Sequence, residues 1–156
     1  MTSIRPILDT DHSAILDLAT DLSEWFDADA RTRAIPIDLH HQQGFVAEEG
    51  GRIVGFITLF VAEGRMNIGW FGVSKDCQRK GVGGRLLDAA EETVRDMSLC
   101  ELATYTLGDS VDYVPYEQTR AFYFKHGFRI YQRSKTNNSS CPEEIKIAKR
   151  IAQQMR

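Results

Sequence analysis

The segment from Gln78 to Arg85 constrains this chain most, because it places three glycines and three basic residues between two apolar runs. The run before it, residues 68–73, has the composition of a strand, and the run after it, residues 86–97, has helical spacing. Glycine lets backbone N–H groups approach a ligand closely, and the first amides of a helix have no partner within it. Those amides and the helix dipole attract phosphate. The sequence therefore predicts a pyrophosphate site at a strand-to-helix turn.

Two well-known phosphate loops do not fit this segment. The Walker loop needs Gly-Lys followed by Ser or Thr, and the chain has no such triplet. The dinucleotide loop needs a third glycine where Leu86 stands. The net charge of −3 also argues against a nucleic acid as partner, since such binding needs a basic surface. A small anionic ligand fits the local basic cluster better.

The length and composition favour one globular domain over residues 1–156. No apolar stretch has the length of a membrane span, and the N-terminus lacks the apolar segment of a signal peptide, so we expect no membrane partner. Cys77, Cys100 and Cys141 are odd in number and lack metal-ligand spacing. We therefore expect free thiols, no metal site and a cytoplasmic location.

The order of predicted elements indicates an α/β fold, with a mixed central sheet of about seven strands flanked by helices. A first helix follows a cap at Thr10 or Asp11, and another begins at Pro115 and ends before Gly127. Residues 27–36 are polar and predict a loop, and residues 37–43 a short helix. Strands are predicted at residues 4–8, 44–48, 52–61, 66–73, 99–107, 128–133 and 143–151.

Two patterns, met in this order, resemble the markers of the GNAT acetyltransferase superfamily. The first is Gln-x-x-Gly-x-Gly at Gln78, Gly81 and Gly83; the second is the Phe-Tyr-x-Lys-x-Gly-Phe segment within residues 120–128. The resemblance covers essentially the whole chain. It implies a GNAT-like domain that uses acetyl-CoA as co-substrate, without a metal, to acetylate a primary amine by direct attack. The acceptor would be a small molecule or a peptide, with a small molecule slightly favoured.

The resemblance also implies roles for individual residues. The edge of the strand at Phe71, Gly72 and Val73 would pair with the pantetheine arm, and an N–H there would polarise the acetyl carbonyl. Tyr123 would protonate the leaving thiolate; the alternative is a packed aromatic without chemistry. The CoA pyrophosphate would lie on the loop formed by Gln78, Arg79, Lys80, Gly81, Val82, Gly83, Gly84 and Arg85.

The chain departs from the family pattern at Asn67, where many relatives have a glutamate. An amide cannot act as a general base. Four candidates for the base remain open, namely Glu63, Glu48, Glu117, or a water molecule held by polar groups that include Asn67. The missing glutamate also motivates a second hypothesis, a CoA-binding sensor or regulatory module without catalysis.

Aromatic residues near two predicted loops are candidates for the acceptor site. Trp25 and Phe26 stand beside acidic residues, so they could hold an amine cation, or they could simply pack on the sheet. Tyr116 lies on the same helix face as Tyr123 by its spacing. A homodimer is a further expectation, from base rates alone.

Overall fold

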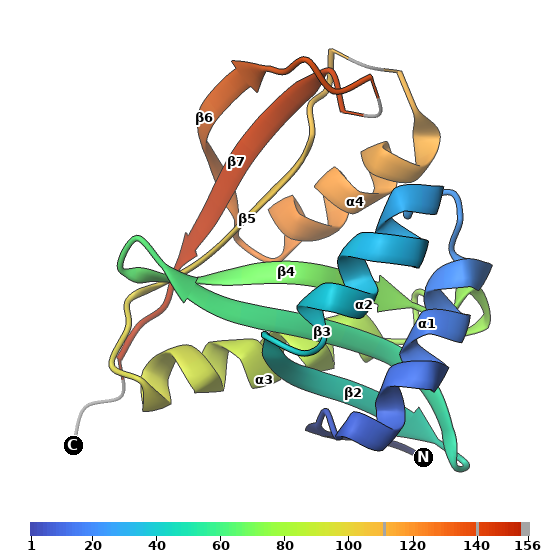
Figure 1. Ribbon diagram of the computed structural model, residues 1–156. Helices are drawn as coiled ribbons and strands as arrows, with labels where there is room; N and C mark the ends of the chain where they lie inside the picture. Colours follow the sequence, from blue (N-terminus) through green and yellow to red (C-terminus); the bar gives the residue numbers. More distant parts are fainter. Residues whose placement is uncertain (111, 140, 154–156) are drawn as a thin grey trace.

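Seven strands form a single sheet with helices on both of its faces (Figure 1). A computed structural model describes residues 1–110, 112–139 and 141–153; residues 111 and 140, which lie between the predicted strands and helices, and residues 154–156 lie outside the description. The strand order is β1-β2-β3-β4-β5-β7-β6, so the predicted mixed α/β sheet is confirmed. The strands are β1 (Thr2–Pro6), β2 (Gln43–Glu49), β3 (Arg52–Ala62), β4 (Arg65–Val73), β5 (Glu101–Leu107), β6 (Arg129–Lys135) and β7 (Glu143–Arg150).

The sheet divides between β4 and β5, which is the one parallel pair among the described strands. These two strands pair only where Met66 meets Leu102 and Asn67 meets Ala103. Past that point they diverge, as Figure 1 shows. The end of β4 that leads to the glycine loop therefore has a backbone edge without a neighbouring strand on that side, among the residues described.

Two hydrophobic cores hold the helices against the sheet. Apolar residues of α3, together with Tyr123 and Phe128, pack on one face, and those of α1 and α2 pack on the other. Because each helix buries an apolar stripe, their burial supplies most of the helical stability. The helical elements are η1 (Asp9–Asp11), α1 (His12–Asp21), η2 (Ala30–Ala34), α2 (Ile35–Asp38), η3 (Lys75–Cys77), α3 (Val82–Asp96) and α4 (Val114–Lys125).

The predicted loop at residues 27–36 is wrong, because much of this segment is helical. Asp27 Oδ1 accepts a hydrogen bond from the N–H of Ala30, at 2.8 Å, and so starts the turn. The N–H of Ile35 then bonds to the carbonyl of Ala30, five residues back, which defines a π-helical turn. That extra residue per turn puts Ala30 and Ile35, both buried, on the same side. A search for 3.6-residue spacing misses this pattern.

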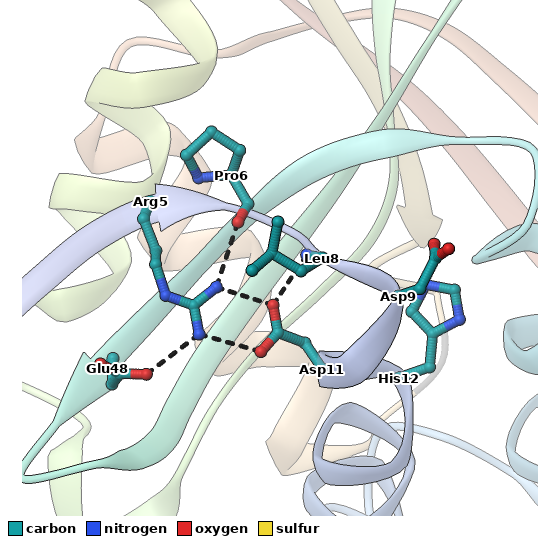
Figure 2. A network of polar contacts seen from close by, with 7 residues as sticks. All are labelled: Arg5, Pro6, Leu8, Asp9, Asp11, His12 and Glu48. Carbon is teal, nitrogen blue, oxygen red and sulfur yellow. Dashed lines mark hydrogen bonds and ion pairs between the residues drawn. The ribbon is translucent and has the colours of Figure 1, made fainter.

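The N-terminal strand lies two residues earlier than the predicted 4–8, at Thr2–Pro6, where it pairs with β2. Arg5 fixes its position (Figure 2). The guanidinium donates to both carboxylate oxygens of Asp11, at 2.7 and 2.9 Å, and to Glu48 Oε2 at 3.0 Å. Asp11 also accepts from the N–H of Leu8, at 2.8 Å. One buried carboxylate therefore ties β1 to η1, and the same guanidinium reaches β2.

Candidate active site

A cleft of about 610 Å³ lies between the end of β4, the start of α3 and the length of α4. Its charged lining residues are all basic: Lys75, Arg79 and Lys125. No Asp or Glu lines it among the residues described. Such a cleft suits an elongated anionic ligand. The remaining lining residues are Leu22, Trp25, Phe26, Phe71, Gly72, Val73, Gln78, Gly83, Gln118, Thr119, Ala121, Phe122 and Tyr123.

The glycine loop presents a run of unpaired amides at one end of the cleft. Arg79 and Gly81 both have left-handed backbones, with φ of 65° and 85°. Glycine adopts this conformation without strain, whereas an arginine there costs about 1 kcal/mol. From Arg79 to Gly84, no amide donates to another described residue; the first helical bond runs from the N–H of Arg85 to the carbonyl of Gly81. Gln78 anchors the loop through Nε2, which donates to the carbonyl of Val73 at 3.0 Å.

The first turn of α3 packs closely on α4 and on the residue that follows it, and this contact favours glycine. A Cβ added at Gly83 would lie 3.1 Å from the ring of Phe122. One added at Gly84 would lie 3.3 Å from the ring of His126. The rings of Phe122 and Phe71, 5.6 Å apart and nearly perpendicular, continue the contact to β4. The close packing keeps the free amides of α3 beside the cleft.

The other loop residues named by the sequence point elsewhere. Val82, the first residue of α3, is buried in the core. Lys80 is exposed and does not line the cleft. Arg85 Nη1 donates to the carbonyl of Thr2 in β1, at 2.5 Å, so its charge is directed away from the cleft. Of the three basic residues of the loop, Arg79 is the one that the structure brings to it.

A bulge in β4 shapes the cleft wall at the point where the sheet divides. On β3, Ile57 pairs with Phe71 and Leu59 pairs with Ile68. Two residues of β4, Gly69 and Trp70, therefore lie opposite the one residue of β3 that separates Ile57 from Leu59. That residue, Thr58, accepts at Oγ1 the N–H of Trp70, at 2.7 Å. Phe71, Gly72 and Val73 follow the bulge directly and line the cleft, on the strand that leads to the glycine loop.

Tyr123 reaches the cleft from α4, close to the point where β4 and β5 diverge. It is 6% exposed and packs edge-on against Phe71 and Phe128. Burial raises the pKa of its phenol, and a hydrogen bond with Thr104 opposes that rise. The phenol is therefore neutral and protonated at physiological pH, which is the state that a proton donor needs. Thr104 also donates to the carbonyl of Ile68, at 3.3 Å, across the strand gap.

Asn67 and Glu63 are not among the residues that line the cleft. The Asn67 amide donates to the carbonyls of Ala62 and Arg65, at 3.3 and 3.1 Å, and so stabilises the β3–β4 turn. Glu63 is exposed in that turn, with a left-handed φ of 56°. Figure 1 shows this turn at the far end of β4 from the start of α3. The predicted base position thus carries a structural amide in this chain.

The two remaining carboxylate candidates also lie outside the cleft lining. Glu48 is bound by Arg5 next to β1, as Figure 2 shows. Glu117 is exposed in the first turn of α4. A proton acceptor supplied through water is therefore the alternative that fits this geometry best.

Three hydrogen bonds join the segment after α1 to the start of α4, and we call this contact the bridge. Trp25 Nε1 donates to the carbonyl of Pro115 at 3.0 Å, and Tyr116 Oη donates to that of Trp25 at 2.7 Å. Tyr113 Oη donates to the carbonyl of Glu24, also at 2.7 Å. Burial raises the pKa of Tyr116 to about 12. Trp25 and Phe26 line the cleft, whereas Tyr116 is not among the lining residues.

Several lining residues carry no clear signal in the sequence. Gln118, Phe122 and Lys125 follow one another at four and three residues on α4, and this spacing could have marked them as one helix face. Leu22 and Lys75 come from segments whose position depends on the whole fold. Lys75 lies after β4 and forms an ion pair with Glu24, at 2.5 Å.

Two absences hold for the residues described. They contain no group of three or more His, Cys, Asp or Glu side chains placed to hold a metal ion. Among the same residues, no helix is both long and apolar enough to span a membrane.

Residues 40–130 match the family model described as Acetyltransferase (GNAT) domain. This chain belongs to the GNAT acetyltransferases. The match includes both the glycine loop and the whole pattern at residues 120–128, so the resemblance found in the sequence is confirmed. The expected N-acetyltransferase is confirmed at the level of the family. The chain extends beyond the matched residues at both ends, with β1 and α1 before them and β7 after them.

Similar proteins agree with this assignment. A Desulfovibrio desulfuricans protein assigned to the GNAT family has a TM-score of 0.83 at 21% identity, over 97% of this chain and 100% of its own. The PaiA N-acetyltransferase of Thermoplasma acidophilum, solved with coenzyme A, has a TM-score of 0.76 at 16% identity, over 96% and 99%. The S-(2-succino)cysteine N-acetyltransferase of Bacillus subtilis (strain 168) is 40% identical over 57 residues, 32% of this chain; the matched part spans about a third of that relative's length, 34%.

Proposed function

We propose that this GNAT protein transfers the acetyl group of acetyl-CoA to a primary amine of a small molecule or peptide. The run of free amides from Arg79 to Gly84, at the end of a cleft lined by basic and not acidic residues, carries this proposal. An anion at a helix N-terminus is bound by such amides and by the helix dipole. The relative from Thermoplasma acidophilum, solved with coenzyme A, supports the choice of ligand.

Each part of the cofactor has a matching surface in the cleft. The pyrophosphate would lie on the loop amides, with Arg79 at its side. The pantetheine arm would follow Phe71 to Val73, whose backbone edge has no strand partner toward β5 among the residues described. The thioester would then reach Tyr123. A backbone N–H directly after the β4 bulge would donate to the thioester carbonyl and stabilise the oxyanion.

The reaction needs no acyl-enzyme. The neutral amine nitrogen attacks the thioester carbon, a C–N bond forms, and the carbonyl oxygen carries the negative charge. As the tetrahedral intermediate collapses, the C–S bond breaks and the Tyr123 phenol gives its proton to the sulfur. The proton lost by the attacking nitrogen restores the phenol. One further proton, that of the original ammonium, passes through water to solvent.

A second candidate, a CoA-binding sensor without catalysis, has one observation in its favour. Asn67 is used by the β3–β4 turn, and no carboxylate lines the cleft among the residues described. A sensor needs the glycine loop but no proton acceptor. It predicts binding of acetyl-CoA without thiol release on any amine.

Thiol release by the unaltered protein separates the two candidates, and Tyr123→Phe tests the acid role in the enzyme. For the enzyme, we expect turnover to fall roughly a hundredfold, since proton donors contribute about 10²–10⁴ to a rate, with the affinity for acetyl-CoA nearly unchanged. Thiol release measures the turnover, and calorimetric titration measures the affinity for acetyl-CoA. Tyr131→Phe is the matched control, because Tyr131 is an exposed phenol on β6 outside the cleft. An unchanged rate in Tyr123→Phe would remove the acid role.

Three further proposals remain from the sequence. We propose a single domain over residues 1–156, a cytoplasmic location and a homodimer. The three cysteines, which are free in the structure, support a reducing compartment. Size-exclusion chromatography with light scattering tests the dimer.

A further inference from the structure

A single buried hydroxyl connects the two diverging strands to α4. Thr104 lies on β5 directly after Ala103, the last residue of that strand that pairs with β4. Its side chain is 9% exposed. Oγ1 donates to the carbonyl of Ile68 on β4, at 3.3 Å, and forms a hydrogen bond with the phenol of Tyr123. A side chain therefore connects β4 and β5 where their backbone pairing ends, and it also reaches α4.

Packing fixes the ring of Tyr123 but not the proton of its hydroxyl. Phe71, Phe122 and Phe128 pack edge-on against the ring, with centroids between 5.0 and 6.2 Å from its own. A phenol O–H rotates about its C–O bond until a hydrogen bond orients it. Among the described residues, Thr104 forms the hydrogen bond that lowers the pKa of Tyr123, and no charged side chain acts on that pKa. The orientation of the phenol O–H therefore depends on Thr104.

A second threonine on the same face of β5 lacks such a contact. Thr106 follows Thr104 at an interval of two residues, so both side chains lie on one face of the strand. Thr106 is 6% exposed, and its Oγ1 has no hydrogen-bond partner among the residues described. Two buried hydroxyls of one type therefore differ in one respect, since that of Thr104 contacts both β4 and Tyr123.

We infer that Thr104 is a positioning residue for the proposed transfer, whose hydroxyl holds the oxygen of Tyr123 against β4 and stabilises the phenolate that forms when the proton leaves. The inference rests on the proposed function, because Tyr123 becomes a phenolate only when a leaving thiolate takes its proton. Ile68 lies on β4 shortly before Phe71, where the cleft begins. The phenol is thus held against the strand that would carry the thioester.

A threonine hydroxyl suits both states of the phenol, since it has one proton and two lone pairs. Before the transfer, the Thr104 proton stays on the Ile68 carbonyl and a lone pair of Oγ1 accepts the phenol O–H. As the C–S bond breaks, the phenol O–H bond breaks and an S–H bond forms. Rotation about the Cβ–Oγ1 bond then turns the Thr104 proton to the phenolate. The proton of the attacking nitrogen restores the phenol, and Thr104 keeps its own proton throughout.

Two substitutions separate the hydroxyl of Thr104 from the shape of its side chain. Thr104→Val keeps the branched shape and removes the hydroxyl, whereas Thr104→Ser keeps the hydroxyl and removes the methyl group. We expect turnover, measured by thiol release, to fall about tenfold in Thr104→Val and to stay within about twofold in Thr104→Ser. Calorimetric titration should give an unchanged affinity for acetyl-CoA in both, because Thr104 does not line the cleft. A slower Thr104→Ser than Thr104→Val would overturn the inference.

Thr106→Val is the matched control, because it removes an unpartnered hydroxyl from the same face of β5 among the described residues. It should leave turnover unchanged. In the Tyr123→Phe background, Thr104→Val should cause no further loss of turnover, since the hydroxyl acts through the phenol. An equal loss with and without the phenol would contradict the assigned role, as would a tenfold loss in Thr106→Val.

The contact between Thr104 and Tyr123 can also be measured without turnover. Thr104→Val and Tyr123→Phe each leave one group without its partner, so the shift in Tm of the double variant should be smaller than the sum of the single shifts. Independent shifts would remove the contact and with it the inference. Coupled shifts in a protein that releases no thiol on any amine would instead contradict the proposed enzyme and leave the contact standing.

Discussion

At the scale of single residues, the loop around Arg79 combines two demands on one position. The backbone there is left-handed, which favours glycine, whereas the side chain lines the cleft and carries a positive charge. Strained backbones of this kind concentrate at functional sites. The position therefore accepts a conformational cost and keeps a cation beside the proposed pyrophosphate.

Arg79→Gly separates these two demands. We expect the free energy of unfolding to change by less than about 1 kcal/mol, because glycine adopts a positive φ freely but has a more flexible unfolded chain. The affinity for acetyl-CoA should fall roughly tenfold, since one charge-assisted contact is lost. Urea unfolding and calorimetric titration measure the two effects. Arg79→Lys should retain most of the affinity; an unchanged affinity in Arg79→Gly would remove this residue from the phosphate site.

At the scale of elements, the crossing of α3 and α4 keeps the helix start against the cleft. Gly83 and Phe122 meet at this crossing, where even a Cβ at residue 83 would be in tight contact with the Phe122 ring. Helices approach this closely only where one of them carries a small residue. The amides of the glycine loop are thus held in place by an aromatic ring from a helix that comes much later in the chain.

Gly83→Leu should abolish measurable acetyl-CoA binding and destabilise the protein by about 1–3 kcal/mol, the usual cost of overpacking. The double variant Gly83→Leu/Phe122→Ala should recover much of the stability, because the smaller side chain leaves room for leucine. Thermal unfolding of the four members of this cycle measures the coupling between the two positions. Strictly additive effects would contradict the contact as the cause.

At the scale of the whole molecule, Arg5 and Asp11 connect the first strand to the remainder of the sheet. The hydrogen bonds from Arg5 are the largest cause that holds the pKa of Asp11 below its usual value. A lowered pKa in the folded state stabilises the fold above the unfolded pKa of about 3.9, and this stabilisation is lost as the pH falls through the folded value. The interaction between Arg5 and Asp11 should therefore weaken only in acid.

Asp11→Asn tests that dependence. We expect it to lower the free energy of unfolding by about 2 kcal/mol at pH 7, where a charged hydrogen-bonded group is lost. The difference from the unaltered protein should shrink progressively below about pH 4. Urea unfolding between pH 7 and pH 3 gives the comparison, with Asp9→Asn as control because Asp9 is fully exposed. A difference independent of pH would argue against the charge as its source.

The sequence was informative wherever local chemistry decides the structure. Gly81 and Gly127 have the positive φ that their positions required, and Pro115 lies in the first turn of α4. The π-helical turn after Asp27 was not predicted, because the spacing of its buried residues is not that of an α-helix. The orientation of the Asn67 side chain was not predicted, because it depends on two carbonyls that the β3–β4 turn places, and no local sequence pattern indicates their positions.

Contacts between side chains that are distant in the chain also could not be predicted from the sequence. Thr104 meets Tyr123 only because β5 passes beneath α4, and Asp38 meets Trp70 only because α2 packs on the β4 bulge. Side chains of these types occur throughout the sequence, so composition and spacing give no reason to choose them. Their roles follow from the topology and from the point at which β4 and β5 separate.

The bridge between Trp25 and the start of α4 has a consequence for the order of events. Its hydrogen bonds hold the cleft wall at Trp25 against the start of α4, the helix that carries Tyr123. In the proposed direct transfer, the amine must reach the thioester while the cofactor occupies this cleft. Both substrates would then be bound together, and we expect the transfer to proceed through a ternary complex.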